Sequence, residues 1–175
     1  MRRFVSSPKR CPRHLERNDK KMSEREQKLE SLGYPLNRTT PEGKLVDAIA
    51  IDGKTVYASG QVTFDGDKLV SKGKVPSQVA VEEATRMAAL CAANVLRIVR
   101  KHVGSLDQIE RVLRITGYVN ADADFTDEHL VINGASQLVR DVFGDAGRHA
   151  RTALGMAQLP LGASTEVEMI LQLKQ

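Results

Sequence analysis

The sequence predicts an α+β fold in which two long helices pack on one side of a mixed or mostly antiparallel sheet. Three observations support this fold class. Segments 77–103 and 127–143 repeat apolar residues at the spacing of one helix face. An Asp52-Gly53 pair separates two strand-like runs, and segment 165–173 alternates apolar and polar residues. The expected order is β-β-α-β-α-β-β, and 175 residues are enough for one domain with a buried core.

Residues 1–21 are predicted to be a disordered basic extension, separate from a domain over 22–175. The extension has eight basic and two acidic residues, a net charge of +6, while the whole chain carries +4. The remainder is therefore net −2, so nucleic-acid binding is not expected of the domain. The extension lacks the apolar stretch of a secretory signal. Met22 followed by Ser23 resembles a native start, so we expect either a mis-called start codon or a nucleic-acid-binding arm.

Bulk features of the chain favour a cytoplasmic protein without a membrane-spanning helix. No apolar run reaches the roughly 18 residues that such a helix needs. Cys11 and Cys91 show neither a paired spacing nor the spacing of a zinc site. Cys91 shares the apolar face of the helix over 77–103, which predicts a small core residue.

The N-terminal half of the domain is predicted to contain a short helix and a hairpin. Ser23 and Glu26 have the spacing of a capping box and begin the helix. Strands over 44–51 and 54–62 form the hairpin. Gly60, near the end of the second strand, indicates either a bulge or the close approach of a ligand or another backbone.

The middle of the chain is predicted to run helix, strand, helix. The helix over 77–103 ends at Gly104, and the basic residues of its last turns suit the negative end of the helix dipole. A strand follows over Ile109 to Asn120. The helix over 127–143 carries Asn133 and Ser136 as polar members of a mixed stripe.

Segments 149–159 and 165–173 are predicted to form a C-terminal hairpin that turns at residues 159–162. Side chains two apart share a face of a strand, which groups His149 with Arg151 and Glu166 with Glu168. If the two faces coincide, Arg151 and Glu166 line one small pocket.

This arginine and glutamate have two interpretations. An arginine presents a permanently charged fork of donors that suits a small carboxylate, and a nearby carboxylate can orient or activate water. The same pair can equally form a cross-strand ion pair on a solvated face, worth about 0 to 1 kcal/mol. The spacing leaves both open.

Four ordered sequence blocks resemble the reactive intermediate deaminase family, also called YjgF-like or endoribonuclease L-PSP. The resemblance extends from about Met22 to Lys174, and residues 133–136 with 142–151 are similar to a less studied bacterial subgroup. The blocks are Ala58-Ser59-Gly60-Gln61, Arg114-Ile115-Thr116-Gly117-Tyr118-Val119-Asn120, Val131-Ile132-Asn133-Gly134-Ala135-Ser136 and the C-terminal segment from Arg148 to Glu168.

The resemblance implies a chorismate mutase-like (YjgF-like) fold and a homotrimer whose sheets build a central β-barrel. Ligand pockets would lie between subunits. The implied reaction is the hydrolysis of 2-imino or 2-enamino acids to 2-keto acids and ammonia, with no cofactor and no metal. Arg151 matches the family arginine that pairs with the substrate carboxylate, and Glu166 matches the residue that positions water. Gly60 and Asn133 match pocket positions, and the backbone carbonyl of Ala153 would hold the water.

The sequence also departs from the family pattern. Leu45 stands near the family's pocket tyrosine, and Ala153 stands where a cysteine is common. His149 replaces a proline beside the arginine, where it either extends the anion site or is structural. Two alternatives to a deaminase therefore stay open. One is a non-catalytic binder of small carboxylic or 2-keto acids. The other is an endoribonuclease, which the net negative domain without a basic, aromatic face disfavours.

Overall fold

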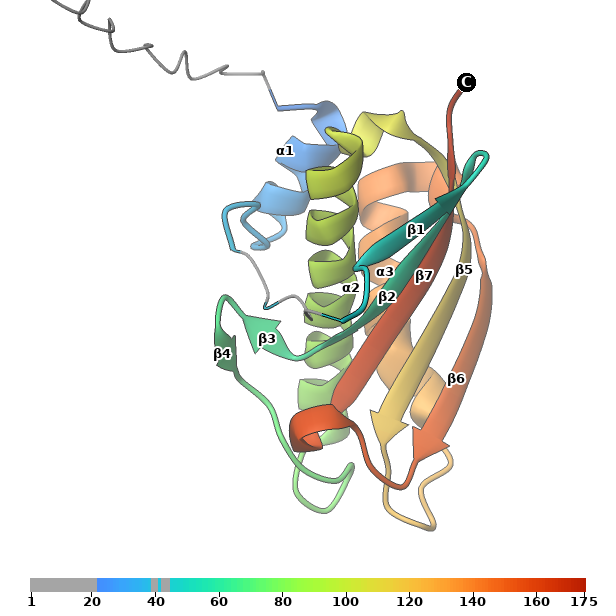
Figure 1. Ribbon diagram of the computed structural model, residues 1–175. Helices are drawn as coiled ribbons and strands as arrows, with labels where there is room; N and C mark the ends of the chain where they lie inside the picture. The colour runs from blue at the N-terminus through green and yellow to red at the C-terminus, as the bar shows by residue number, and fades with distance from the viewer. Residues whose placement is uncertain (1–21, 39–40, 42–44) are drawn as a thin grey trace, which may run out of the picture.

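The main sheet has five strands in the order β1-β2-β7-β5-β6, and a two-stranded sheet pairs β3 with β4. The computed structural model describes residues 22–38, 41 and 45–175 (Figure 1). The predicted extension over 1–21 lies outside the described residues. The helices are α1 (Glu24–Ser31), α2 (Val81–Val103) and α3 (Glu128–Phe143), with short 3-10 turns η1 (Leu106–Gln108), η2 (Gly144–Gly147) and η3 (Pro160–Gly162). The strands are β1 (Ile49–Asp52), β2 (Thr55–Val62), β3 (Phe64–Asp65), β4 (Lys68–Leu69), β5 (Ile109–Asn120), β6 (Ala150–Met156) and β7 (Thr165–Leu173).

The two long helices cover one face of this sheet, as the sequence predicts. Figure 1 shows α2 and α3 behind the strands, while the face toward the viewer has no helix over it. Apolar side chains between the layers form one core, which includes Val56, Ile115, Val167 and Met169. None of the helices in the described part of the chain is both long and apolar enough to cross a membrane.

The predicted C-terminal hairpin is wrong. β5 lies between β6 and β7, pairing with β7 in antiparallel and with β6 in parallel orientation. A parallel neighbour cannot be reached by a tight turn, and here α3 provides the crossover from β5 to β6. The turn over 159–162 is the 3-10 turn η3, and the chain around it passes the end of β5 before β7 begins. β6 is therefore an edge strand.

Glycines allow α3 to pack closely against its neighbours. A Cβ on Gly134 would lie 2.0 Å from the backbone oxygen of Thr85, so α2 and α3 touch through their main chains. A Cβ on Gly117 of β5 would lie 2.4 Å from Cδ1 of Ile132. Larger residues at either glycine would push α3 away from the layer that positions its polar side chains.

The helix α2 begins at Val81 and not at the predicted residue 77. The N–H groups of Gln78 and Val79 both donate to the carbonyl of Lys74, which closes a separate turn before the helix. Gly104 ends the helix as predicted, with a positive φ of 87°. Cys91 is a core residue, also as predicted, and burial raises the pKa of its thiol to about 12.

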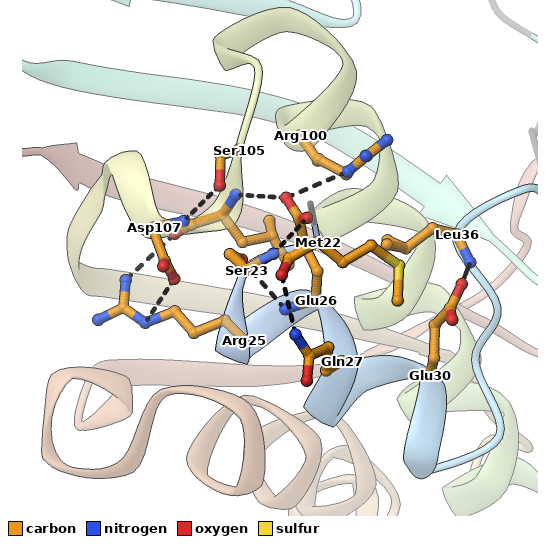
Figure 2. Close-up of polar contacts among 11 residues, drawn as sticks. Met22, Ser23, Arg25, Glu26, Gln27, Glu30, Leu36, Arg100, Ser105 and Asp107 are labelled. Atoms are coloured by element: carbon orange, nitrogen blue, oxygen red, sulfur yellow. Dashed lines mark hydrogen bonds and ion pairs between the residues drawn. The ribbon is translucent and has the colours of Figure 1, made fainter. Parts of the chain in front are cut away.

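The buried Glu26 carboxylate fixes α1 to the end of α2 (Figure 2). It completes the predicted capping box by accepting from the N–H of Ser23 at 3.0 Å. It also accepts from the N–H of Leu106 at 3.1 Å and lies 3.2 Å from Nε of Arg100. Burial acts to raise the pKa of Glu26, but these hydrogen bonds and the Arg100 charge outweigh it, so the pKa is lowered.

Candidate functional site

Arg151 lies on the edge strand β6 and points toward α3. It stands in register with the buried Ile115 of β5, so its side chain extends from the same face of the sheet, the one that the helices cover. Its Nη1 donates to Oδ1 of Asn133 at 2.8 Å and to Oγ of Ser136 at 3.3 Å. Asn133 and Ser136 are three apart on α3 and therefore share one side of the helix. The structure thus brings together two of the residues that the sequence singled out, Arg151 and Asn133.

One side of the Arg151 guanidinium remains open. No carboxylate lies within ion-pair distance of it, and its Nε and Nη2 have no hydrogen-bond partner, within the described residues. The residue is exposed. A guanidinium that is held through Nη1 and free at Nε and Nη2 can receive a carboxylate through two parallel charge-assisted hydrogen bonds.

Ser136 links Arg151 to His149. Nε2 of His149 lies 3.0 Å from Oγ of Ser136, and Nδ1 lies 2.6 Å from the carbonyl oxygen of Gly147. A carbonyl only accepts, so Nδ1 carries the proton and Nε2 accepts from the Ser136 hydroxyl. Burial lowers the pKa of His149, and the charges of Arg151 and Arg140 lower it further against the opposing effect of the Gly147 bond. His149 is therefore neutral at neutral pH.

Glu166 lies on the other face of the sheet. It stands in register with Tyr118 of β5, and its neighbour Val167 points into the core, so Glu166 points away from the helices. Burial and the charge of Glu168 raise the pKa of its carboxyl. The condition that the faces of Arg151 and Glu166 coincide is therefore not met within one chain, because β5 separates their strands and the register places them on opposite faces.

Gly60 belongs with Glu166. It lies in a β-bulge of β2, between the pairings of Ala58 and Gln61 with β7. A Cβ on Gly60 would lie 2.0 Å from Oε1 of Glu166, so only glycine leaves room for this carboxylate. Of the two interpretations of Gly60, the bulge is confirmed, and the group that approaches the glycine is the Glu166 side chain and not a backbone.

The remaining predicted positions lie apart from this contact. Ala153 is half-buried on β6 in register with Gly117, two residues beyond Arg151 and on the same face. Leu45 is 99% exposed, and it lies outside the sheet because β1 begins at Ile49 and not at the predicted residue 44. The ladder with β2 runs over residues 49–52, and just before it the carbonyls of Asp47 and Ala48 accept hydrogen bonds from Ser59 of β2.

A hollow of about 640 Å³ lies beside Asn133 and Ser136. It runs over α2 and α3, and its other wall includes Leu32, Tyr34 and Ala89. Within the described residues, no group of three or more His, Cys, Asp or Glu side chains is placed to hold a metal ion.

The sequence identified Ser136 only as a polar member of its helix and not as a site residue. Its three-residue spacing from Asn133 was the signal that could have placed it in the site.

Comparison with known proteins identifies the family. Residues 28–173 match the model of the family described as "YjgF/chorismate mutase-like, putative endoribonuclease". Protein TCP17 of Trypanosoma cruzi is 34% identical over 146 residues, which cover 83% of this chain and 91% of that protein. The chain therefore belongs to the YjgF family.

Solved structures agree with this assignment. The protein Atu1372 from Agrobacterium tumefaciens, whose function is unknown, is 39% identical with a TM-score of 0.79 and covers 86% of this chain and 92% of its own. A protein from Shewanella oneidensis, described as a "putative endoribonuclease", is 24% identical with a TM-score of 0.82, covering 86% of this chain and 100% of its own. The latter similarity is one of fold.

Proposed function

We propose that the protein hydrolyses 2-imino or 2-enamino acids to 2-keto acids and ammonia without a cofactor, and that Arg151 anchors the substrate carboxylate. The main support for this proposal is the hydrogen bonding of the Arg151 guanidinium. Its Nη1 is held by Asn133 and Ser136, while its other donors face no carboxylate within the described chain. The chain belongs to the YjgF family, and the sequence resemblance to that family is what implies this reaction class.

The chemistry follows from holding the carboxylate. Two charge-assisted hydrogen bonds of roughly 1.5 to 3 kcal/mol each fix the substrate in one orientation. The adjacent imine carbon is then presented to water at a fixed place. Water forms a new C–O bond while the C=N π electrons move to nitrogen. Loss of ammonia from this adduct yields the keto acid.

In the proposed site, the protein carboxylate that positions water is Glu166 of a neighbouring subunit in a homotrimer. Glu166 lies on the sheet face that no helix covers (Figure 1). That face also exposes large apolar side chains, with Tyr57 49% and Leu154 43% exposed. Apolar surface of this kind favours association with another copy. In such an assembly, Glu166 of one subunit positions water at Arg151 of the next.

The test uses imines that an amino-acid oxidase generates in the assay. Release of ammonia and keto acid is compared for the wild-type protein and Arg151→Ala. The matched control is Arg148→Ala, since Arg148 is exposed and pairs with Asp145 at 3.2 Å. Turnover that is lost in Arg151→Ala and kept in Arg148→Ala supports the proposal. Absence of wild-type turnover contradicts it.

A non-catalytic binder of small 2-keto acids is the second candidate. It is favoured by the separation of Arg151 and Glu166 on opposite faces of one chain, because a lone anchored arginine binds a carboxylate without handling protons. Keto-acid binding that depends on Arg151, with no turnover in the wild type, would select this function. The endoribonuclease alternative rests on the description of the family and of the Shewanella oneidensis protein.

A further inference from the structure

The Ser136 hydroxyl has one unused place for a hydrogen bond. A hydroxyl donates once and accepts twice. Ser136 donates to Nε2 of His149 and accepts once from Nη1 of Arg151. Its second lone pair has no partner within the described residues. A water that approaches a substrate held on Arg151 can therefore donate to Ser136.

We propose that Ser136 and His149 form a proton relay for the reaction at Arg151, with His149 as the base and the Ser136 hydroxyl as the bridge. This inference rests on the proposed imine hydrolysis and names further catalytic residues for it. The geometry has the three parts that such a relay needs, a hydroxyl within reach of the substrate anchor, a base 3.0 Å from the hydroxyl, and a group that orients the base. The orienting group is the Gly147 carbonyl.

The groups around His149 favour its neutral form, which can accept a proton. Ser136 and Arg140 face it from α3, Arg151 faces it from β6, and the Gly147 carbonyl closes the remaining side. The neighbouring Arg148 is paired with Asp145. Two positive charges and partial burial favour the neutral imidazole, which is the form that works as a base.

The relay also fits the position of the other candidate base. In one chain Glu166 is on the far face of the sheet, whereas Ser136 touches the guanidinium that would hold the substrate. Proton transfer through Ser136 therefore needs no second subunit. Glu166 of a neighbouring subunit can orient water without being the group that takes its proton.

The proposed steps balance. Water oxygen bonds to the iminium carbon as the π electrons move to nitrogen. The water proton passes to Ser136 Oγ while the Ser136 hydrogen passes to Nε2 of His149. The same path then returns a proton to the amino nitrogen. The C–N bond breaks, and the hydroxyl proton leaves with ammonia, giving the keto acid and ammonium.

Three variants and one control test the relay in the oxidase-coupled assay. His149→Gln keeps an acceptor for the Ser136 hydroxyl but cannot take up a proton, so kcat should fall by about 10²- to 10⁴-fold while KM changes little. The kcat of Ser136→Ala should fall by a similar factor. Ser136→Thr, which keeps a hydroxyl, should recover part of this loss. The control is His102→Gln, since His102 also bonds a backbone carbonyl, that of Ile98 at 2.9 Å, but lies on α2.

A pH profile separates a proton relay from a merely structural pair. Wild-type kcat should decline as the pH falls through the pKa of His149, which lies below its usual value of 6.5. The decline should disappear in His149→Gln. Wild-type turnover with an unchanged kcat in His149→Gln overturns the relay alone and leaves the pair as a support for Arg151. Absence of wild-type turnover overturns both the relay and the proposed function.

Discussion

Replacing Arg151 with lysine should weaken the binding of small 2-keto acids by about 10- to 100-fold. The substitution keeps the positive charge but removes the planar fork. In the structure, Nη1 alone serves both Asn133 and Ser136, which leaves Nε and Nη2 for the ligand. The change therefore tests geometry and not charge.

The expected change in Kd depends on how many N–H donors the side chain at position 151 has left for the ligand. A lysine ammonium has three N–H groups. Two of them are needed for Oδ1 of Asn133 and Oγ of Ser136, so one remains for the ligand carboxylate. The loss of one charge-assisted hydrogen bond costs roughly 1.5 to 3 kcal/mol, and about 1.4 kcal/mol corresponds to a tenfold change in Kd.

The measurement is a calorimetric titration with pyruvate at constant ionic strength. Arg148→Lys is the matched control, because its guanidinium pairs with Asp145 and not with Asn133. Its Kd should equal that of the wild type. An unchanged Kd in Arg151→Lys would refute the reasoning, since the carboxylate would then bind without the fork or at another place.

Three further predictions concern stability and are measured by thermal or denaturant unfolding. Glu166→Gln should raise Tm at pH 8 but not near pH 4, because a carboxyl whose folded pKa is raised destabilises the fold only above that pKa. Glu26→Ala should cost about 1 to 3 kcal/mol at pH 7, because it removes the acceptor of the Ser23 and Leu106 N–H groups; since the pKa of Glu26 is lowered, the cost should shrink as the pH falls below 4.5. Gly134→Ala should cost about 1 to 3 kcal/mol, because its Cβ would meet the Thr85 carbonyl. An unchanged midpoint in any of these variants contradicts the corresponding contact.

Local signals predicted most elements of the fold. The capping box at Ser23, the strand over Ile109–Asn120 and the helix end at Gly104 all appear where the sequence indicates them. Each depends on residues that are close together in the chain, such as a side chain and a backbone group three residues away. The pairing of strands does not, because alternation of apolar residues identifies a strand without naming its neighbour. The parallel pairing of β5 with β6 was missed for this reason.

The candidate site shows the same division. The contact between Arg151 and Asn133 follows from the family resemblance, which already associates these positions with one pocket. The bond between Ser136 and His149 joins residues of a helix and a strand edge, and no periodicity reports it. The placement of Glu166 depended on knowing which strand lies beside β7. The predicted hairpin placed β6 directly beside β7, whereas β5 lies between them and Glu166 is on the opposite face from Arg151.

A mixed-subunit experiment tests most directly whether Arg151 and Glu166 of different copies form one imine-hydrolysing site. Arg151→Ala and Glu166→Gln proteins, each inactive alone, are co-expressed in equal amounts with different tags, and mixed assemblies are purified through both tags. In a trimer that contains both variants, about one third of the sites receive an unmutated Arg151 from one subunit and an unmutated Glu166 from the next. The account therefore predicts that the purified mixed trimers recover about a third of wild-type ammonia release. Mixed trimers that stay inactive, or a Glu166→Gln protein that is active by itself, would contradict it.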